Sequence, residues 1–266
     1  MGRKSIAQQF ENLESAGGKA FIAYIMAGDG GLANLKDQIL QLESTGVSIV
    51  ELGIPFSDPV ADGPAIQEAG KRALAEGVTL KEVLTAVAGF KDEINIPIVI
   101  MTYANPVLRL GVGNFAALCE EAGISGVIIP DVPYEESAEF EVPLKDVDIA
   151  LIRFVTLTSS KARMEEVLKT AEGFVYAVTV NGTTGIRDGF DDSLGAHLEA
   201  VRQVSPVPVC AGFGIKTREQ AREIGAHCDG VIVGSRIVEL LHAGQAEEIA
   251  DLIPENAGIE KVRQID

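Results

Sequence analysis

Short apolar segments alternate with amphipathic segments along most of the chain. Eight segments are rich in β-branched and aliphatic residues and have the length of a strand: 20–27, 48–54, 97–103, 126–130, 149–156, 174–180, 207–213 and 230–234. Between them, apolar residues recur at the spacing of a helix, as in 32–45, 112–122, 161–171, 193–204 and 217–225. The strand segments are apolar at successive positions, which is typical of parallel strands that helices cover.

Eight strand–helix units in a chain of 266 residues match the count and length of a (β/α)8 barrel, or TIM barrel. A doubly wound sheet is the alternative, but "MAGDGG" after the first strand is not the Gly-rich fingerprint of that fold. Because no linker or change of composition divides the chain, we expect one domain over residues 1–266. An extra helical segment is predicted over 62–76, between the second strand and its own helix over 79–90. It therefore lies at the C-terminal ends of the strands, where barrel active sites are built.

The composition narrows the classes of function. Hydrophobic residues make up 47% of the chain, as in a globular protein, and 22 basic residues face 39 acidic ones, for a net charge of −17. This excess of acid argues against nucleic-acid binding, although backbone N–H groups can still hold a phosphate ester. No segment approaches the ~20 apolar residues that span a membrane, and the start of the chain lacks the apolar region of a secretory signal. We therefore expect a cytoplasmic protein without membrane or nucleic-acid partners.

Few side chains are available for metal binding or for histidine chemistry. The cysteines, Cys119, Cys210 and Cys228, are widely spaced, so we interpret them as core residues in a reducing compartment and not as a disulfide frame or a zinc site. The only three histidines all lie in helix-like segments. We therefore expect no metal, and any acid–base chemistry falls to carboxyl groups or tyrosines.

The segment "ELGIPFSDPVADGP", residues 51–64, places a glutamate inside an apolar strand. Strand side chains alternate between faces, so Val50, Leu52 and Ile54 suit the helix-covered side and Glu51 points into the barrel. A glutamate in an internal ion pair is one interpretation. The surrounding sequence offers no cation, however, and an unpaired carboxyl group in an apolar cavity has a raised pKa that suits proton transfer.

Two aspartates, Asp58 and Asp62, follow in the loop after that strand. Each is of a type common in turns, and Asp62 could cap the helix in whose first turn Pro64 lies. Asp62 also lies at the same face as Glu51, and two carboxyl groups can divide the work between proton donor and charge stabiliser. The pattern does not say which group has which role.

Small residues follow the last two strands. Gly212 and Gly214 end strand seven, and Gly234 and Ser235 lead from strand eight into a helix. In this fold, glycines after the last two strands and the N-terminus of a helix together form the common phosphate site. Ordinary turns also need glycine, however. The loop over 181–189, "NGTTGIRDG", is typical of a mobile lid that could add Gly185 to that site.

Aromatic and apolar side chains lie toward the ends of the predicted strands. Filling of the barrel is the default interpretation for most of them, but those near the C-terminal ends could line a flat apolar pocket. The set is Tyr24, Met101, Tyr103, Ile128, Tyr176, Phe213 and Ile232. Together with the glycines, it predicts a substrate with an aromatic body and a phosphate tail, on which carboxyl groups act without a metal.

Several motifs resemble those of a known family. "ELGIPFSDPVADGP" is similar to the signature of the tryptophan synthase alpha chain, and "YIMAGDG", "MTYANPV", "GVIIPDVPYEES", "NGTTG", "AGFGI" and "GVIVGS" follow in that family's order along essentially the whole chain. The resemblance implies a TIM barrel that cleaves indole-3-glycerol phosphate to indole and glyceraldehyde 3-phosphate. It implies a retro-aldol lyase reaction without a metal or an organic cofactor in this chain.

The resemblance also assigns roles to residues. It implies that Glu51 transfers the proton at indole C3 and that of the side-chain hydroxyl, and that Asp62 stabilises the ring N–H. Tyr176 matches the family's strand-six tyrosine, and Thr184 matches the threonine that orders the closed lid. The phosphate contacts it implies are Gly185, Gly214, Gly234 and Ser235. The indole pocket it implies is Tyr24, Met101, Ile128, Phe213 and Ile232.

A partner is implied as well. In the family, indole passes through a tunnel to a beta chain that carries pyridoxal phosphate, within an alpha2-beta2 tetramer that makes tryptophan. Pro55, Asp58 and Asp131 resemble the parts that meet this partner, which makes Asp58 a communication residue. Alternatives are a stand-alone lyase, a non-catalytic activator of the beta chain, and another phosphate-binding barrel. Enzymes of that last class usually rely on a lysine or on other strand-end residues, and the predicted strands hold no lysine.

Three positions depart from the family pattern. Thr183 stands in the lid where valine is more common, and Ala23 in the first strand where proline is common. Arg153 lies in the fifth strand where an apolar residue or proline is expected. A buried arginine needs an acidic partner, which the sequence does not identify.

Overall fold

The computed structural model describes residues 3–178, 192–212 and 214–257 of the chain. The described strands form one parallel sheet in the order β5-β4-β3-β2-β1-β9-β8-β7-β6. Their bounds are β1 Ala20–Met26, β2 Ile49–Gly53, β3 Ile98–Met101, β4 Gly126–Ile128, β5 Ala150–Leu151, β6 Arg153–Thr156, β7 Val175–Val178, β8 Val209–Gly212 and β9 Gly230–Val233. The pairing of β1 with β9 joins the first strand to the last. This order confirms the barrel and contradicts the doubly wound alternative.

The predicted strand over 149–156 is divided into β5 and β6 by Ile152. Its first part pairs with β4, and its second part pairs with β7. The Ile152 N–H still donates to the Val127 carbonyl at 2.9 Å, which extends the contact with β4. The barrel therefore closes through a single segment that changes its neighbour halfway along.

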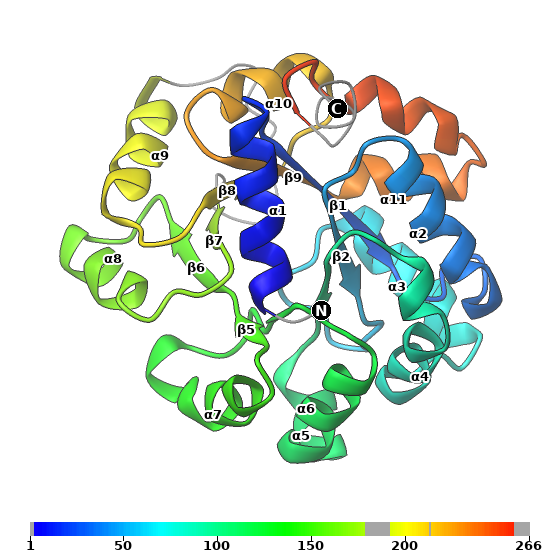
Figure 1. The fold of residues 1–266 in the computed structure, drawn as a ribbon. Coiled ribbons are helices and arrows are strands. Elements are labelled where there is room, and N and C mark those ends of the chain that lie inside the picture. The colour runs from blue at the N-terminus through cyan, green and yellow to red at the C-terminus, as the bar shows by residue number, and fades with distance from the viewer. Residues whose placement is uncertain (1–2, 179–191, 213, 258–266) are drawn as a thin grey trace.

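Helices surround the sheet as an outer ring (Figure 1). They are α2 Leu35–Ser44, α3 Pro64–Ala75, α4 Leu80–Phe90, α5 Ala104–Leu110, α6 Val112–Glu121, α7 Ala138–Asp146, α8 Lys161–Leu168, α9 Asp192–Val204, α10 Arg218–Gly225 and α11 Ser235–His242. Short 3-10 turns cover Leu32–Asn34, Lys91–Glu93, Tyr134–Glu136 and Ala246–Leu252. The predicted extra segment is α3. Within the described residues, no helix is both long enough and apolar enough to cross a membrane.

Local sequence explains where the two helices after β2 begin. Pro64 is the first residue of α3, a position at which its missing N–H and fixed φ cost nothing. Thr79 and Glu82 form a capping box at the start of α4, in which each side chain binds the backbone of the other residue. Such a box satisfies two N–H groups that would otherwise lack partners. The starts of α3 and α4 are thus both fixed by local sequence.

An N-terminal helix that the apolar pattern did not predict, α1 Arg3–Ser15, closes one end of the barrel. It lies across the middle of the ring of helices in Figure 1. Ile6, Phe10 and Leu13 of α1 are buried in one cluster with side chains from inside the barrel, among them Ile22 and Phe174. The interior of the barrel (the lumen) is therefore covered at the N-terminal ends of the strands. The loop that follows β2 lies at the opposite end.

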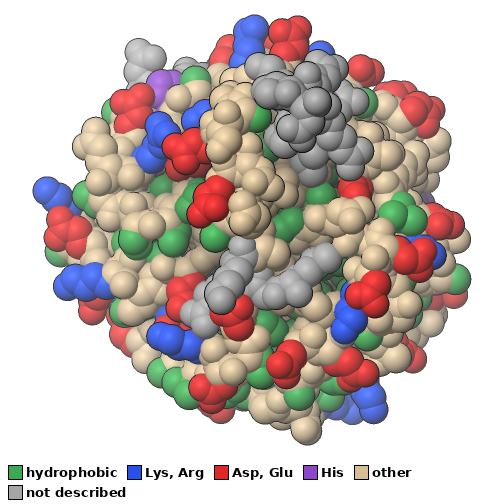
Figure 2. Space-filling model, viewed as in Figure 1, with side chains coloured by type: hydrophobic (Ala, Val, Ile, Leu, Met, Phe, Trp, Pro, Cys, Tyr) green, Lys and Arg blue, Asp and Glu red, His purple; other side chains and the backbone are tan. Residues whose placement is uncertain are grey.

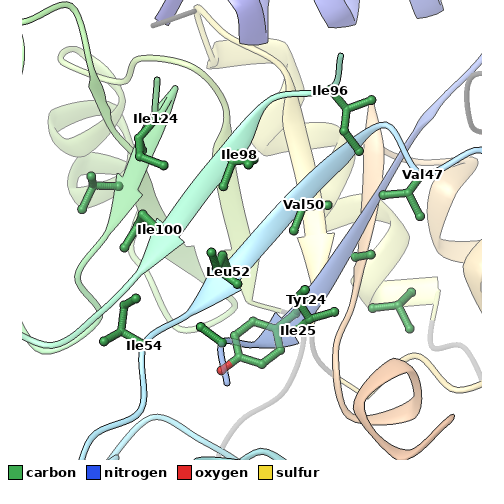
Figure 3. Packing of buried hydrophobic residues seen from close by; sticks show 14 of the residues in the cluster. Tyr24, Ile25, Val47, Val50, Leu52, Ile54, Ile96, Ile98, Ile100 and Ile124 are labelled. Atoms are coloured by element: carbon green, nitrogen blue, oxygen red, sulfur yellow. The ribbon is translucent and has the colours of Figure 1, made fainter. Parts of the chain in front are cut away.

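The alternation predicted for β2 is confirmed. Val50, Leu52 and Ile54 belong to the larger core cluster between sheet and helices (Figure 3), whereas Ile49 packs in the lumen cluster. Glu51 is next to Ile49 on the same face, and the register places it beside Tyr24 of β1 and Val99 of β3. On the outer surface, acidic and basic side chains are interspersed over the face that Figure 2 shows.

Candidate active site

Glu51 is a buried acid inside the barrel. The residue is only 1% exposed, and its Oε2 has no hydrogen-bond partner among the described residues. None of the ion pairs in the described part of the chain involves it. Burial, with a smaller contribution from the Asp62 charge, raises the pKa of Glu51 to about 8. A carboxyl group of this pKa is mostly protonated at neutral pH, and it can both give and take a proton there.

Asp62 is buried at the mouth of the lumen and does not cap α3. Gly63 is the N-cap residue of that helix, and no side chain caps it. Asp62 is 6% exposed, and its Oδ1 has no hydrogen-bond partner among the described residues. Burial raises its pKa to about 6, against the opposing effect of a hydrogen bond from Tyr103. Asp62 therefore loses its proton below neutral pH, while Glu51 keeps its own.

Tyr103, two residues after β3, holds the loop that carries Asp62. Its hydroxyl accepts a hydrogen bond from the Ala61 N–H at 3.1 Å, and its ring stacks on Phe56 with 5.2 Å between centroids. Burial, with the Asp62 charge next, raises the pKa of Tyr103. The sequence interpretation treated this tyrosine only as a strand-end side chain. Its position one residue before α5 gave no sign of contact with a loop forty residues earlier.

Tyr24 and Tyr176 complete a cluster of acidic and phenolic groups. The Tyr24 hydroxyl lies over Gly53, because a Cβ added there would be 2.0 Å from it, and the Tyr176 hydroxyl similarly lies over Gly212, at 2.6 Å. Burial raises the pKa of both phenols; the charge of Asp62 adds most for Tyr24, and that of Glu51 for Tyr176. Both tyrosines stay protonated at neutral pH. The two glycines give the rings their space.

The other pocket residues proposed from the sequence lie around the same cluster where they are described. Ile128 and Ile232 are buried in the lumen cluster, and Met101 packs against it. Gly234 approaches Tyr24, since a Cβ on it would be 3.4 Å from the Tyr24 Cβ, and Ser235 is the first residue of α11. Gly214 has a φ of 82°, which glycine adopts without strain. The lid residues Thr183, Thr184 and Gly185 lie outside the described residues, as does Phe213.

The residues proposed to meet a partner differ in exposure. Asp58 and Asp131 are exposed, whereas Pro55 is buried. Asp58 accepts a hydrogen bond from Ser57, and Asp131 accepts one from the Ala104 N–H at 3.0 Å, at the first residue of α5. Asp131 therefore binds a backbone N–H group of the first turn of α5, which has no hydrogen-bond partner within the helix.

The acidic partner of Arg153 is Glu141 of α7. The Arg153 side chain is 6% exposed, and its guanidinium also lies over the Tyr134 ring, 5.1 Å from the centroid. Arg163 of α8 lies over the same ring at 5.5 Å and pairs with Glu135. A cavity of about 400 Å³ adjoins these residues and reaches Met101 and Tyr176 at its inner end.

The arrangement suits acid–base chemistry on a neutral aromatic body. Two buried carboxyl groups differ in pKa, three phenols surround them, and a helix begins at Ser235 beside Gly234. A helix N-terminus favours a phosphate group. No group of three or more metal-ligating side chains occurs among the described residues.

Comparison with known proteins identifies the family. The family model of the tryptophan synthase alpha chain matches residues 10–264. The tryptophan synthase alpha chain of Bacillus mycoides strain KBAB4 is 53% identical over 253 residues, which cover 95% of this chain and 96% of that one. The solved tryptophan synthase subunit alpha of Legionella pneumophila strain Paris is 31% identical with a TM-score of 0.84, over 99% of this chain and 98% of that one. A chain in the aminoacrylate-bound tryptophan synthase of M. tuberculosis is 30% identical with a TM-score of 0.84, over 95% and 98%. The chain therefore belongs to the tryptophan synthase alpha chain family.

Proposed function

We propose that this chain cleaves indole-3-glycerol phosphate to indole and glyceraldehyde 3-phosphate by a retro-aldol reaction. The observation that carries the proposal is the buried Glu51 without an ion pair, whose pKa is raised to about 8 beside an Asp62 whose pKa is about 6. Near pH 7 the first group holds a proton and the second does not. Such a difference between neighbouring carboxyl groups separates their roles.

The reaction needs one group that gives a proton and then takes one back. The bond between indole C3 and the first side-chain carbon breaks, its electrons return to the ring, and the hydroxyl on that carbon becomes an aldehyde. The net change moves the hydroxyl proton to C3. Protonated Glu51 donates to C3 and, as a carboxylate, accepts the hydroxyl proton, so that it ends as it began. A pKa near 8 suits both steps.

Asp62 and the tyrosines bind the ring during these steps. As a carboxylate, Asp62 accepts a hydrogen bond from the ring N–H and stabilises the positive charge that forms at nitrogen when C3 is protonated. Tyr176 and Tyr24, whose burial keeps them protonated, enclose the aromatic body with Met101, Ile128, Ile232 and Phe213. The phosphate is assigned to backbone N–H groups at Gly185, Gly214, Gly234 and Ser235. Thr184 is assigned to the closure of the lid.

We propose further that the indole is passed to a beta chain that carries pyridoxal phosphate, in an alpha2-beta2 tetramer, and that this chain uses no metal or cofactor of its own. The exposed Asp58 and Asp131 support this assignment, as they lie on loops at the mouth of the barrel. Both carboxyl groups needed for turnover are present, which argues against a chain that only activates its partner.

The test is indole release from indole-3-glycerol phosphate by the purified chain, with and without a beta chain. Glu51→Gln should abolish turnover while the substrate still binds, because the amide neither donates to carbon nor accepts the hydroxyl proton. Glu76→Gln, at the exposed end of α3, is the matched control and should behave as the parent. Unchanged turnover of Glu51→Gln would contradict the role of Glu51. Full activity without any gain from a beta chain would favour a stand-alone lyase.

A further inference from the structure

The cavity of about 400 Å³ beside the site extends well beyond the catalytic cluster. Its inner end is formed by Met101, Phe154 and Tyr176, and its outer end by Phe140 of α7 with Met164 and Val167 of α8. Neither Glu51 nor Asp62 is among the described residues that line it. The cavity is therefore a side chamber that leads away from the acid–base groups, and its volume lies in the range of small-molecule pockets.

The chamber follows from the division of the fifth strand. Because side chains alternate along β6, Phe154 faces the lumen, whereas Arg153 and Val155 face the surrounding helices. All three line the chamber. It therefore continues past β6 to α7 and α8. On the lumen side, the Phe154 ring packs against Tyr176 with 5.1 Å between centroids.

The chemistry of the walls indicates a neutral, apolar occupant. Phe140, Met164 and Val167 are all buried, so the outer end is built from core side chains. The cations at the rim are already paired, Arg153 with Glu141 and Arg163 with Glu135. Both guanidinium charges are thus already balanced, so an uncharged group fits the chamber better than a further anion. The buried Arg153 Nε, which has no hydrogen-bond partner among the described residues, leaves one donor for a polar substituent.

The orientation of the ring in the proposed function decides what reaches the chamber. Glu51 acts at C3 and Asp62 at the ring nitrogen, and both positions belong to the five-membered ring. The six-membered ring then points away from the carboxyl groups, toward Met101 and Tyr176, where the chamber begins. We propose that the chamber receives substituents at positions 5 and 6 of the indole ring, so that the enzyme accepts ring-substituted substrates, with Met164 and Val167 limiting their size. This inference rests on the proposed function.

The test uses the reverse reaction of the full chain, in which C3 of an indole adds to the aldehyde of glyceraldehyde 3-phosphate and its proton moves to the new hydroxyl. The chain contains no tryptophan, so the fluorescence of the indole can be followed directly. For 5-bromoindole and 6-bromoindole, kcat/KM should lie within about tenfold of that for indole. Val167→Phe and Met164→Phe should each lower these two values by about tenfold or more, with kcat/KM for indole unchanged. Val142→Phe adds the same ring on the exposed face of α7, where Val142 is 58% exposed, and should change nothing.

Each outcome decides between the proposals. If the parent enzyme turns over indole but neither bromoindole, the proposed role of the chamber is wrong. An equal loss for all three indoles in both filled variants would also overturn it, because that loss reports general damage to packing. If indole itself does not react, the proposed function fails, and calorimetric binding of 6-bromoindole then tests the chamber alone. Binding that Val167→Phe abolishes would support the chamber, and binding that it leaves intact would overturn it.

Discussion

At the scale of single residues, the pKa difference between Glu51 and Asp62 predicts the pH dependence of the proposed reaction. The active form has Glu51 protonated and Asp62 ionised, so kcat/KM should rise with pH through about 6 and fall through about 8. A pH profile of indole release measures both limbs. Asp62→Asn should lose the acid limb while it keeps the alkaline one. An acid limb that survives in this variant would assign it to another group.

Gly53 is predicted to be required because of the space it gives to Tyr24. A Cβ at this position would lie 2.0 Å from the Tyr24 hydroxyl, so Gly53→Ala must displace the ring from its place beside Glu51. Overpacking of this kind costs about 1–3 kcal/mol of unfolding free energy, which urea denaturation measures, and indole release should fall as well. The control is Gly89→Ala in α4, where nothing lies within 4 Å. There the change should be neutral or stabilising, since alanine favours a helix.

At the scale of elements, the pair of Arg153 and Glu141 ties β6 to α7. Glu141→Gln would leave a guanidinium that is 6% exposed without its counter-charge, which we expect to cost about 3 kcal/mol of unfolding free energy. Replacement of both residues by leucine should recover much of this loss, because the buried charge is removed together with its partner. A double-mutant cycle by chemical denaturation measures the coupling. Single variants whose losses simply add would show that the two side chains do not interact.

Elements with a regular period were predictable from the sequence, and contacts between distant residues were not. The alternation along β2 placed Glu51 inside the barrel because strand side chains repeat every two residues. The break at Ile152 gave no signal, since Ile152 is itself an aliphatic residue typical of a strand and the segment 149–156 contains neither glycine nor proline. The partner of Arg153 lies on the preceding helix, and nothing local marks Glu141 among its acidic neighbours. Whether Asp62 or Gly63 caps α3 depends on backbone geometry, which residue type alone did not decide.

At the scale of the whole molecule, α5 is expected to contribute to the surface that meets a beta chain. Its first N–H group is bound by Asp131, and its Leu108 is 47% exposed. Leu108→Asp should reduce the gain in indole release that a beta chain gives, because a carboxylate would be buried without a partner at the contact. Turnover of the isolated chain should not change. Val204→Asp, at a position 43% exposed on α9, is the control, and equal effects of both substitutions would exclude α5 from the contact.

The whole barrel was predictable because its signal is repeated in unit after unit, whereas the helix at its base lies outside that repeat. The proposed lid was recognised only through the sequence of 181–189, which lies outside the described residues. That residues 1–266 form one domain stays a prediction.

The position of α1 has a consequence for the order of folding. This helix precedes every strand in the chain, yet its binding surface includes Phe174, whose ring lies 6.3 Å from that of Phe10, and Ser125, whose Oγ is 2.6 Å from that of Ser5. During synthesis, α1 must therefore wait for the segment that carries Phe174 before it can dock fully. Closure of such distant contacts is slow because the chain loses its freedom before the contact forms. The base of the barrel is thus sealed late, and until then the apolar side chains of α1 are exposed to other molecules.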